Sequence, residues 1–217
     1  MLQKTFLAII WISFLLLTGC ASTVTERRAV IDGDQAYQER LVAAKTKPAE
    51  ADFTALRLAY AQTAAYNPYL GPEQGRNTAL FAALQGEQFD QALELAQQLL
   101  ASNYMSLDGH YVAWQGYEAS GNANRALHHR VFLNALLESI SASGDGITTE
   151  TAYRVISSQE MYAFLGLHGL EPRSQALLRA GHTTYNRVTV IDNDGNRRDV
   201  YFDITLQVER GFSPNSD

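Results

Sequence analysis

Apolar residues recur at helical spacing through the middle of the chain, between about residues 73 and 143. Ala79 recurs as Ala113 and Ala92 as Ala126, which gives a repeat of 34 residues. A repeat of this length is typical of arrays in which one helical hairpin buries its apolar face by stacking on the next. Such an array presents a surface to partners and carries no reactive groups of its own. The predicted helices cover about residues 73–85, 88–101, 108–119 and 123–142.

Glycines and small residues support this division. Gly86, Gly121 and Gly144 follow the first, third and fourth helices, where a left-handed cap favours glycine. Ala92 and Ala126 fall where tetratricopeptide-type hairpins place a small residue so that two helices approach closely, and this part of the chain resembles that superfamily. The same register predicts a mostly buried Trp114. The other equivalent pairs are Leu80 and Trp114, Ala83 and Tyr117, Leu93 and Leu127, and Leu99 and Leu133.

Two segments precede the array. Asp52 is the expected N-cap of a helix that ends at residues 67–68, because the residue before a proline avoids the helical region. Residues 22–51 are polar and mixed, which favours a flexible tether, with a short helix at residues 34–41 as the alternative. The helix after Asp52 is expected to place Phe53, Leu56, Tyr60 and Ala64 on one face.

The periodicity changes after residues 144–146, which we expect to form a domain hinge. Ser157 or Ser158 is the expected cap of a short helix that ends at Gly166 or Gly169. Apolar residues alternate with polar ones in the segments before and after that helix, and an Asp-Gly turn signal lies between two of these segments. The expected strands are residues 152–156, 174–178, 185–191 and 199–208. In the last strand the residues on one face are Val200, Phe202, Ile204, Leu206 and Val208.

The fold class predicted from these patterns is α+β. Tetratricopeptide-like helical hairpins come first, and a small antiparallel β-meander with one helix follows and packs on them. The expected parts are a lipoprotein signal peptide at residues 1–19, a lipidated N-terminus and tether at 20–51, the helical part at 52–143, the α+β part at 144–212 and a disordered tail at 213–217.

The first twenty residues predict export. Lys4 precedes twelve mostly apolar residues, too few to span a bilayer as a helix, which needs about 20. The stretch ends in Leu17-Thr18-Gly19-Cys20, which resembles the lipobox of bacterial lipoproteins, where a signal peptidase cuts before a lipidated cysteine. Acyl chains on Cys20 are expected to anchor the chain in a lipid bilayer. No aspartate follows the cysteine, which favours the periplasmic face of the outer membrane of a Gram-negative bacterium.

Composition narrows the choice of partners. The 17 basic and 23 acidic residues give a net charge of −6, which argues against nucleic acid. Cys20 is the single cysteine, so an internal disulfide is excluded. Of the side chains with catalytic or ligand chemistry, His182 draws most interest. Asp203 and Glu150 are the carboxylates with which it would form a site.

The other polar motifs favour structural roles. Adjacent residues on a helix point about 100° apart, so His128 and His129 suit a solvated face better than a metal. His110 and His168 are expected to be surface or turn residues. Asp192-x-Asp194-Gly195 begins like a calcium loop but lacks the closing glutamate, which favours a hairpin turn. The sequence therefore predicts no metal and no cofactor.

The chain from about residue 53 to residue 212 resembles the bacterial domain-of-unknown-function family 4919. The resemblance rests on Glu150 to Ser157, on the runs at residues 161–170, 174–177, 181–182 and 200–204, and on the early residues Phe53, Leu56, Arg57, Tyr60 and Asn67 to Tyr69. The family occurs in exported and lipid-anchored proteins and implies no activity.

The favoured function is a non-catalytic binding or scaffold module in the cell envelope, with an envelope protein as its partner. One alternative is an envelope enzyme, hydrolase-like, with a site in the C-terminal part. The other is a purely structural lipoprotein. The array carries Phe81, Tyr104, Tyr111, Trp114 and Tyr117, which suit core packing, whereas uncovered rings on a concave surface would favour binding.

Overall fold

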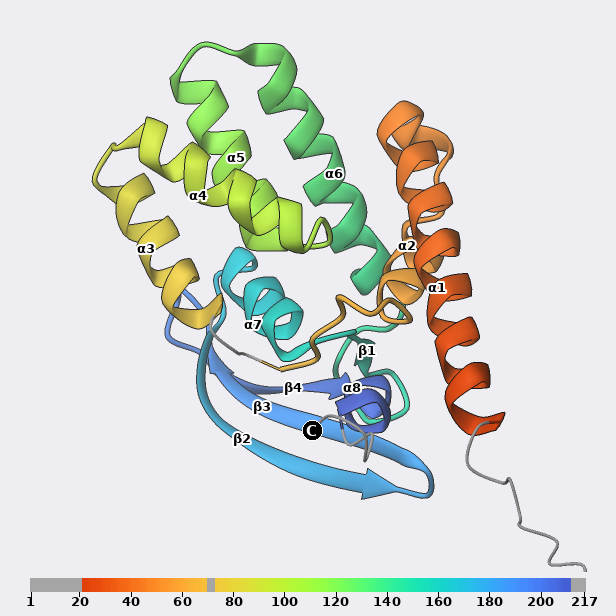
Figure 1. The fold of residues 1–217 in the computed structure, drawn as a ribbon. Coiled ribbons are helices and arrows are strands. Elements are labelled where there is room, and N and C mark those ends of the chain that lie inside the picture. The colour runs from red at the N-terminus through yellow and green to blue at the C-terminus, as the bar shows by residue number, and fades with distance from the viewer. Residues whose placement is uncertain (1–20, 70–72, 212–217) are drawn as a thin grey trace, which may run out of the picture.

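The computed structural model describes residues 21–69 and 73–211, which form eight helices, one short 3₁₀ turn and a four-stranded sheet. Figure 1 shows the sheet on one side and helix α7 against it, with α3 to α6 beyond α7 and with α1 and α2 at the side of the molecule. The helices are α1 (Ala21–Thr46), α2 (Phe53–Tyr60), α3 (Glu73–Gln85), α4 (Phe89–Ser102), α5 (Leu107–Ala119), α6 (Ala123–Ser141), α7 (Ser158–Leu167) and α8 (Thr205–Gly211), and the 3₁₀ turn is η1 (Pro48–Glu50). The strands are β1 (Tyr153–Arg154), β2 (Glu171–Ala180), β3 (Thr183–Ile191) and β4 (Arg197–Asp203).

Helices α3 to α6 form the two predicted hairpins, with bounds within two residues of those expected. Each packs on the next in sequence, and α3 also contacts α5. Ala92 and Ala126 are both buried, as the register requires, but Leu127 is half exposed. Helices α4 and α5 approach closely at two glycines of α5: a β-carbon at Gly116 would come within 2.9 Å of Leu93, and one at Gly109 within 2.9 Å of Leu100. Trp114 packs against the core and keeps only part of its surface exposed, so the mostly buried position expected from the repeat is confirmed.

The glycine caps follow the prediction at one helix only. Gly121 has φ +76°, but after α3 the left-handed residue is Glu87, with φ 56°, and not Gly86. Gly144 is required for a different reason, because a β-carbon there would meet the carbonyl oxygen of Thr151 at 2.2 Å. The amides of residues 145 and 146 both donate to that carbonyl. Residues 144–146 thus form a hydrogen-bonded turn at the position where the hinge was expected.

Helix α1 occupies the segment for which a flexible tether was favoured. Tyr37, Leu41 and Ala44 recur at helical spacing and are buried against the rest of the chain, so the helical alternative is correct in kind, although the helix is much longer than residues 34–41. Helix α2 begins as predicted, with the carboxylate of Asp52 accepting a hydrogen bond from the amide of Ala55 at 2.8 Å. It ends at Tyr60 and not at residues 67–68, because a turn at residues 61–65 follows.

The sheet has the order β1-β4-β3-β2 and is mixed. Strands β2, β3 and β4 form the predicted antiparallel meander, while β1 pairs parallel to β4, which corrects the purely antiparallel expectation. Asp192 accepts hydrogen bonds from the amides of Asp194 and Asn196, which confirms a hairpin turn. The predicted last strand ends at Asp203, and Leu206 and Val208 belong to α8.

One apolar core joins the helical part to the sheet. Val188, Val190, Val200 and Phe202 on the sheet are fully buried and belong to the same cluster as side chains of α1, α2, α6 and α7. The N-cap of α7 is Ser157, whose hydroxyl accepts from the amide of Glu160 at 3.0 Å.

A buried ion pair crosses this core. Arg57 on α2 donates two hydrogen bonds of 2.7 Å to the carboxylate of Glu160 on α7, and each side chain is only 4% exposed. The same guanidinium donates to the hydroxyl of Ser139 and to the carbonyl oxygen of Arg154. Glu160 also accepts from the amide of Ile156. The network ties α2, α6, α7 and β1 together.

Candidate functional site

The structure does not assemble the three candidate residues of the C-terminal part into a site. His182 is exposed in the turn between β2 and β3, and Glu150 is exposed in the loop before β1. Asp203, at the end of β4, accepts from the backbone and hydroxyl of Thr205 and lies 3.8 Å from the guanidinium of Arg154. Within residues 21–69 and 73–211, no hydrogen bond joins His182 to either carboxylate.

The anchor prediction concerns residues that the structure does not describe. Leu17, Thr18, Gly19 and Cys20 lie outside the described residues, as does the expected tail at residues 213–217. In the part of the chain that is described, no helix combines the length and the apolarity that crossing a membrane requires. The same part contains no cluster of three or more His, Cys, Asp or Glu side chains arranged to hold a metal ion.

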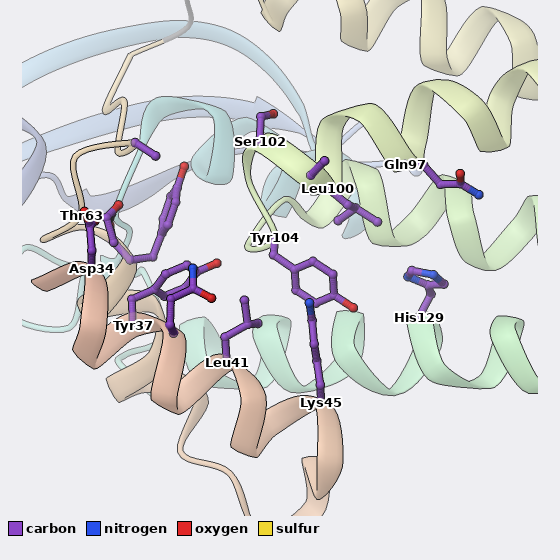
Figure 2. Close-up of a pocket in the computed structure, with 14 residues that line it drawn as sticks. Asp34, Tyr37, Leu41, Lys45, Thr63, Gln97, Leu100, Ser102, Tyr104 and His129 are labelled. Carbon is purple, nitrogen blue, oxygen red and sulfur yellow. Dashed lines mark hydrogen bonds between the residues drawn. The ribbon is translucent and has the colours of Figure 1, made fainter.

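The first cavity is a cleft of about 520 Å³ between α1 and the α4–α6 region. Figure 2 shows Asp34, Tyr37, Leu41 and Lys45 following one another along α1, on the side that faces Tyr104 and Leu100. These positions are three or four residues apart, so they lie on one helical face. His129 on α6 lines the same cleft, next to Gln97 of α4.

Behind His129 lies a cluster of histidines that the sequence did not predict. His110 on α5 is fully buried and stacks on the ring of Phe132, with 5.1 Å between centroids. Its Nδ1 lies 3.0 Å from Nδ1 of His129, and its Nε2 lies 2.9 Å from the carbonyl oxygen of Tyr104. The hydroxyl of Tyr104 is 2.9 Å from Nε2 of His128. The solvated face expected for residues 128–129 and the surface position expected for His110 are therefore wrong.

The backbone determines the tautomers in this cluster. A carbonyl oxygen only accepts, so Nε2 of His110 carries the proton and its Nδ1 is an acceptor. Nδ1 of His129 must then donate to that acceptor, which leaves Nε2 of His129 as an unprotonated nitrogen. Burial, together with the neighbouring histidines, lowers the pKa of His110 to about 3 and that of His129 to about 4. Both rings are neutral at pH 7.

A sequence signal for the burial of His110 exists. Leu107, His110 and Ala113 are three residues apart, and both apolar neighbours are buried on the face of α5 that packs into the core. A histidine in the middle of an apolar face is a buried histidine whenever a partner is at hand. The partner, His129, is 19 residues away on the next helix, and no local pattern indicates it.

The second cavity is a groove of about 830 Å³ between α3, α5 and α7. Its lining is mostly apolar and aromatic, with polar groups at one side. The aromatic and aliphatic lining residues are Phe81, Leu84, Tyr111, Tyr162, Ala163 and Leu167, and the polar ones are Asn77, Thr78, Gln85, Asp108 and Gln159. Of these, Tyr111 and Phe81 were singled out in the sequence as surface or core aromatics, and both are only partly buried.

Three aromatic rings form a continuous row beside this groove. The ring of Tyr111 lies 6.2 Å from that of Phe81 and 6.1 Å from that of Trp114, measured between centroids. All three side chains are partly exposed. In a helical array, uncovered rings on the inner helices are the feature that distinguishes a binding surface from a closed core.

The polar side of the groove is buried and incompletely hydrogen-bonded. Asp108 accepts a hydrogen bond of 2.8 Å from the side-chain nitrogen Nδ2 of Asn77, and burial raises the pKa of this carboxyl to about 6. The side-chain oxygen of Asn77 and the side-chain nitrogen of Gln159 are buried without a partner in the described structure. An unsatisfied buried polar atom is disfavoured by about 1–3 kcal/mol. The oxygen of Asn77 can therefore accept, and the nitrogen of Gln159 can donate, a hydrogen bond to a bound ligand.

Residues 35–210 match a family model whose description is a domain of unknown function (DUF4919). Comparison with curated proteins and with solved structures finds no match.

Proposed function

The chain belongs to the DUF4919 family, which has no known function, and we propose that it is a lipid-anchored binding module of the cell envelope. Its binding site is the groove between α3, α5 and α7, and its ligand is a peptide segment of an envelope partner protein. The observation that carries the proposal is the partly exposed row of Phe81, Tyr111 and Trp114 beside that groove.

The helical array supports a binding role. Two hairpins stacked at a 34-residue repeat resemble tetratricopeptide arrays, in which the inner helices face a concave surface. Here the inner helices are α3 and α5, which contact each other and supply the row of rings. Helix α7 of the C-terminal part forms the opposite wall, so the groove is bounded on both sides.

The polar groups favour a peptide over a purely apolar ligand. Asn77 offers an unpaired acceptor and Gln159 an unpaired donor on opposite walls of the groove. A peptide unit carries one N–H and one C=O, which match that pair. The apolar part of the groove then receives one side chain of the peptide against Phe81 and Tyr111, the geometry in which aromatic residues contribute most to binding.

The anchor rests on Leu17 to Cys20. Helix α1 starts at Ala21, so it would join a lipidated Cys20 directly to the folded body with no flexible spacer between them. A Cys20→Ala chain should remain unprocessed and should take up no palmitate. Radiolabelled palmitate followed by membrane fractionation measures both, and label retained by the variant would contradict the anchor.

The groove is tested by selecting peptides from a random library on the chain from residue 21 onward. Selected peptides should lose at least tenfold in affinity, about 1.4 kcal/mol, when Tyr111 or Phe81 is replaced by serine. Leu177→Ser is the matched control, because Leu177 is an exposed apolar residue, 65% accessible, on β2 and outside the groove. Peptides that bind both groove variants as tightly as the parent chain would contradict the site.

A further inference from the structure

The cleft along α1 is separate from the peptide groove, because none of its lining residues lines that groove. Asp34 and Lys45 are eleven residues apart on α1, about 16 Å along a helix, and they mark its two ends. Between them the wall is formed by Tyr37 and Leu41, with Leu100 opposite. The cleft is therefore long, apolar in the middle, acidic at one end and basic at the other.

The basic end contains a cation with no anionic partner. The ammonium group of Lys45 lies 3.7 Å from the ring centroid of Tyr104, a cation–π contact. In the described part of the chain no carboxylate forms an ion pair with Lys45. Arg125, four residues before His129 on α6, lies over the ring of Tyr117 and forms no ion pair with a carboxylate of the described residues. An anion that binds at this end can therefore pair with Lys45 without displacing a carboxylate.

His129 adds a second, different contact at this end. Its Nδ1 donates to His110, and its Nε2 makes no hydrogen bond within the described residues. Nε2 is an acceptor, because the carbonyl oxygen of Tyr104 determines the tautomers of both rings. The ring itself is held by stacking on Tyr117, with 5.7 Å between centroids. The end of the cleft thus offers one cationic donor and one neutral acceptor.

We propose that this cleft binds an amphipathic phosphate monoester, with the phosphate at Lys45 and His129 and the apolar body along Tyr37, Leu41 and Leu100. A phosphate monoester near neutral pH carries about −1.5 to −2 charges and retains a hydroxyl in part of its population. Its charged oxygens suit Lys45, and its hydroxyl donates to Nε2 of His129. A carboxylate has no such hydroxyl, and Asp34 at the other end disfavours the reverse orientation by repulsion.

The probe is monodecyl phosphate, titrated by calorimetry into the chain from residue 21 onward below the micelle concentration. Three comparison ligands each change one feature. Decanoate replaces the phosphate group by a carboxylate, decanol removes the charge, and glycerol phosphate removes the apolar chain. Monodecyl phosphate should bind at least tenfold more tightly than each of the three. Equal binding of decanol would overturn the role of the charge, and equal binding of glycerol phosphate would overturn the role of the apolar wall.

Two variants test whether the phosphate group of the ligand binds at Lys45 and His129. Lys45→Met and His129→Phe should each weaken binding of monodecyl phosphate at least tenfold, and phenylalanine keeps the stacking on Tyr117. Lys47→Met is the matched control, because Lys47 is exposed and pairs with Glu50 outside the cleft. Thermal melts verify that each variant is folded. Binding of monodecyl phosphate to folded Lys45→Met with unchanged affinity overturns the proposal, even if His129→Phe does not fold.

Discussion

Replacing Arg57 by methionine removes the one cation of the buried network between the helical part and the C-terminal part. The guanidinium makes two hydrogen bonds of 2.7 Å to Glu160, one of 3.1 Å to Ser139 and one of 3.0 Å to the carbonyl oxygen of Arg154. Methionine fills similar volume but makes none of these bonds. The carboxylate of Glu160, 4% exposed, is left with the amide of Ile156 as its remaining donor.

Breaking a buried ion pair from one side is destabilising by about 3–5 kcal/mol, because an uncompensated charge stays in the interior. That is a large fraction of a net stability of about 5–15 kcal/mol. For a chain of this size about 2–4 °C of melting temperature corresponds to 1 kcal/mol, so the midpoint should fall by roughly 6–20 °C. The drop should appear in a single transition, since one core joins the two parts.

The double variant Arg57→Met/Glu160→Leu separates the charge from the rest of the network. It removes both charges, so its destabilisation should be smaller than the sum of the two single variants by about 2–3 kcal/mol. Urea unfolding followed by circular dichroism gives the four free energies of the cycle. Arg154→Met serves as the control, because that side chain is 61% exposed and its ion pair with Asp203 should contribute at most about 1 kcal/mol. Additive losses, or a loss for Arg57→Met no larger than for the control, would refute the reasoning.

The remaining predictions concern acid stability, packing and cooperativity. Burial lowers the pKa of His110 to about 3, below the usual 6.5, so as the pH falls the unfolded chain protonates this histidine before the folded chain does. The contribution of neutral His110 to stability is therefore fully present above about pH 6.5 and is lost as the pH falls toward 3. His110→Gln should reduce the slope of the unfolding free energy against pH by up to the contribution of one proton, about 1.4 kcal/mol per pH unit. Urea unfolding at several pH values measures this slope, and an unchanged slope between about pH 6.5 and 4 would contradict the prediction. Ala126→Leu overpacks a buried position and should lower stability by about 1–3 kcal/mol in thermal melts, whereas an unchanged midpoint would count against the 34-residue register. Cutting the gene at Gly144 should yield two poorly soluble fragments, because each loses the shared core, and two soluble fragments with separate sharp melts would show independent domains.

Local patterns predicted the elements whose burial depends on near neighbours. The bounds of α3 to α6 follow from apolar spacing, and the turn at Asp192 follows from its side chain and Gly195, which has φ +84°. Ser157 was one of two expected caps, and its hydroxyl accepts from the amide of Glu160, three residues away. In each case the partners are within a few residues, so the sequence alone contains the relevant information.

The predictions from sequence were wrong where the form of a segment depends on contacts with distant residues. Helix α1 mixes polar and apolar residues without a clear apolar face, and Tyr37, Leu41 and Ala44 are buried against a core built by later segments. Strand β1 is two residues long and exists through its parallel pairing with β4, about fifty residues onward. Residues 204–208 alternate like a strand, yet Asp203 caps the backbone of Thr205 and a helix follows.

The sequence by itself determined an α+β chain with two helical hairpins and a strand meander. Only the tertiary structure decided which polar side chains are buried together: Arg57 with Glu160 across 103 positions, and His110 with His129 across two helices. The reason is physical. A buried charge or ring nitrogen is tolerated only when it has a hydrogen-bonding partner. Whether that partner lies within reach depends on how distant helices pack, and not on the residues beside the buried group.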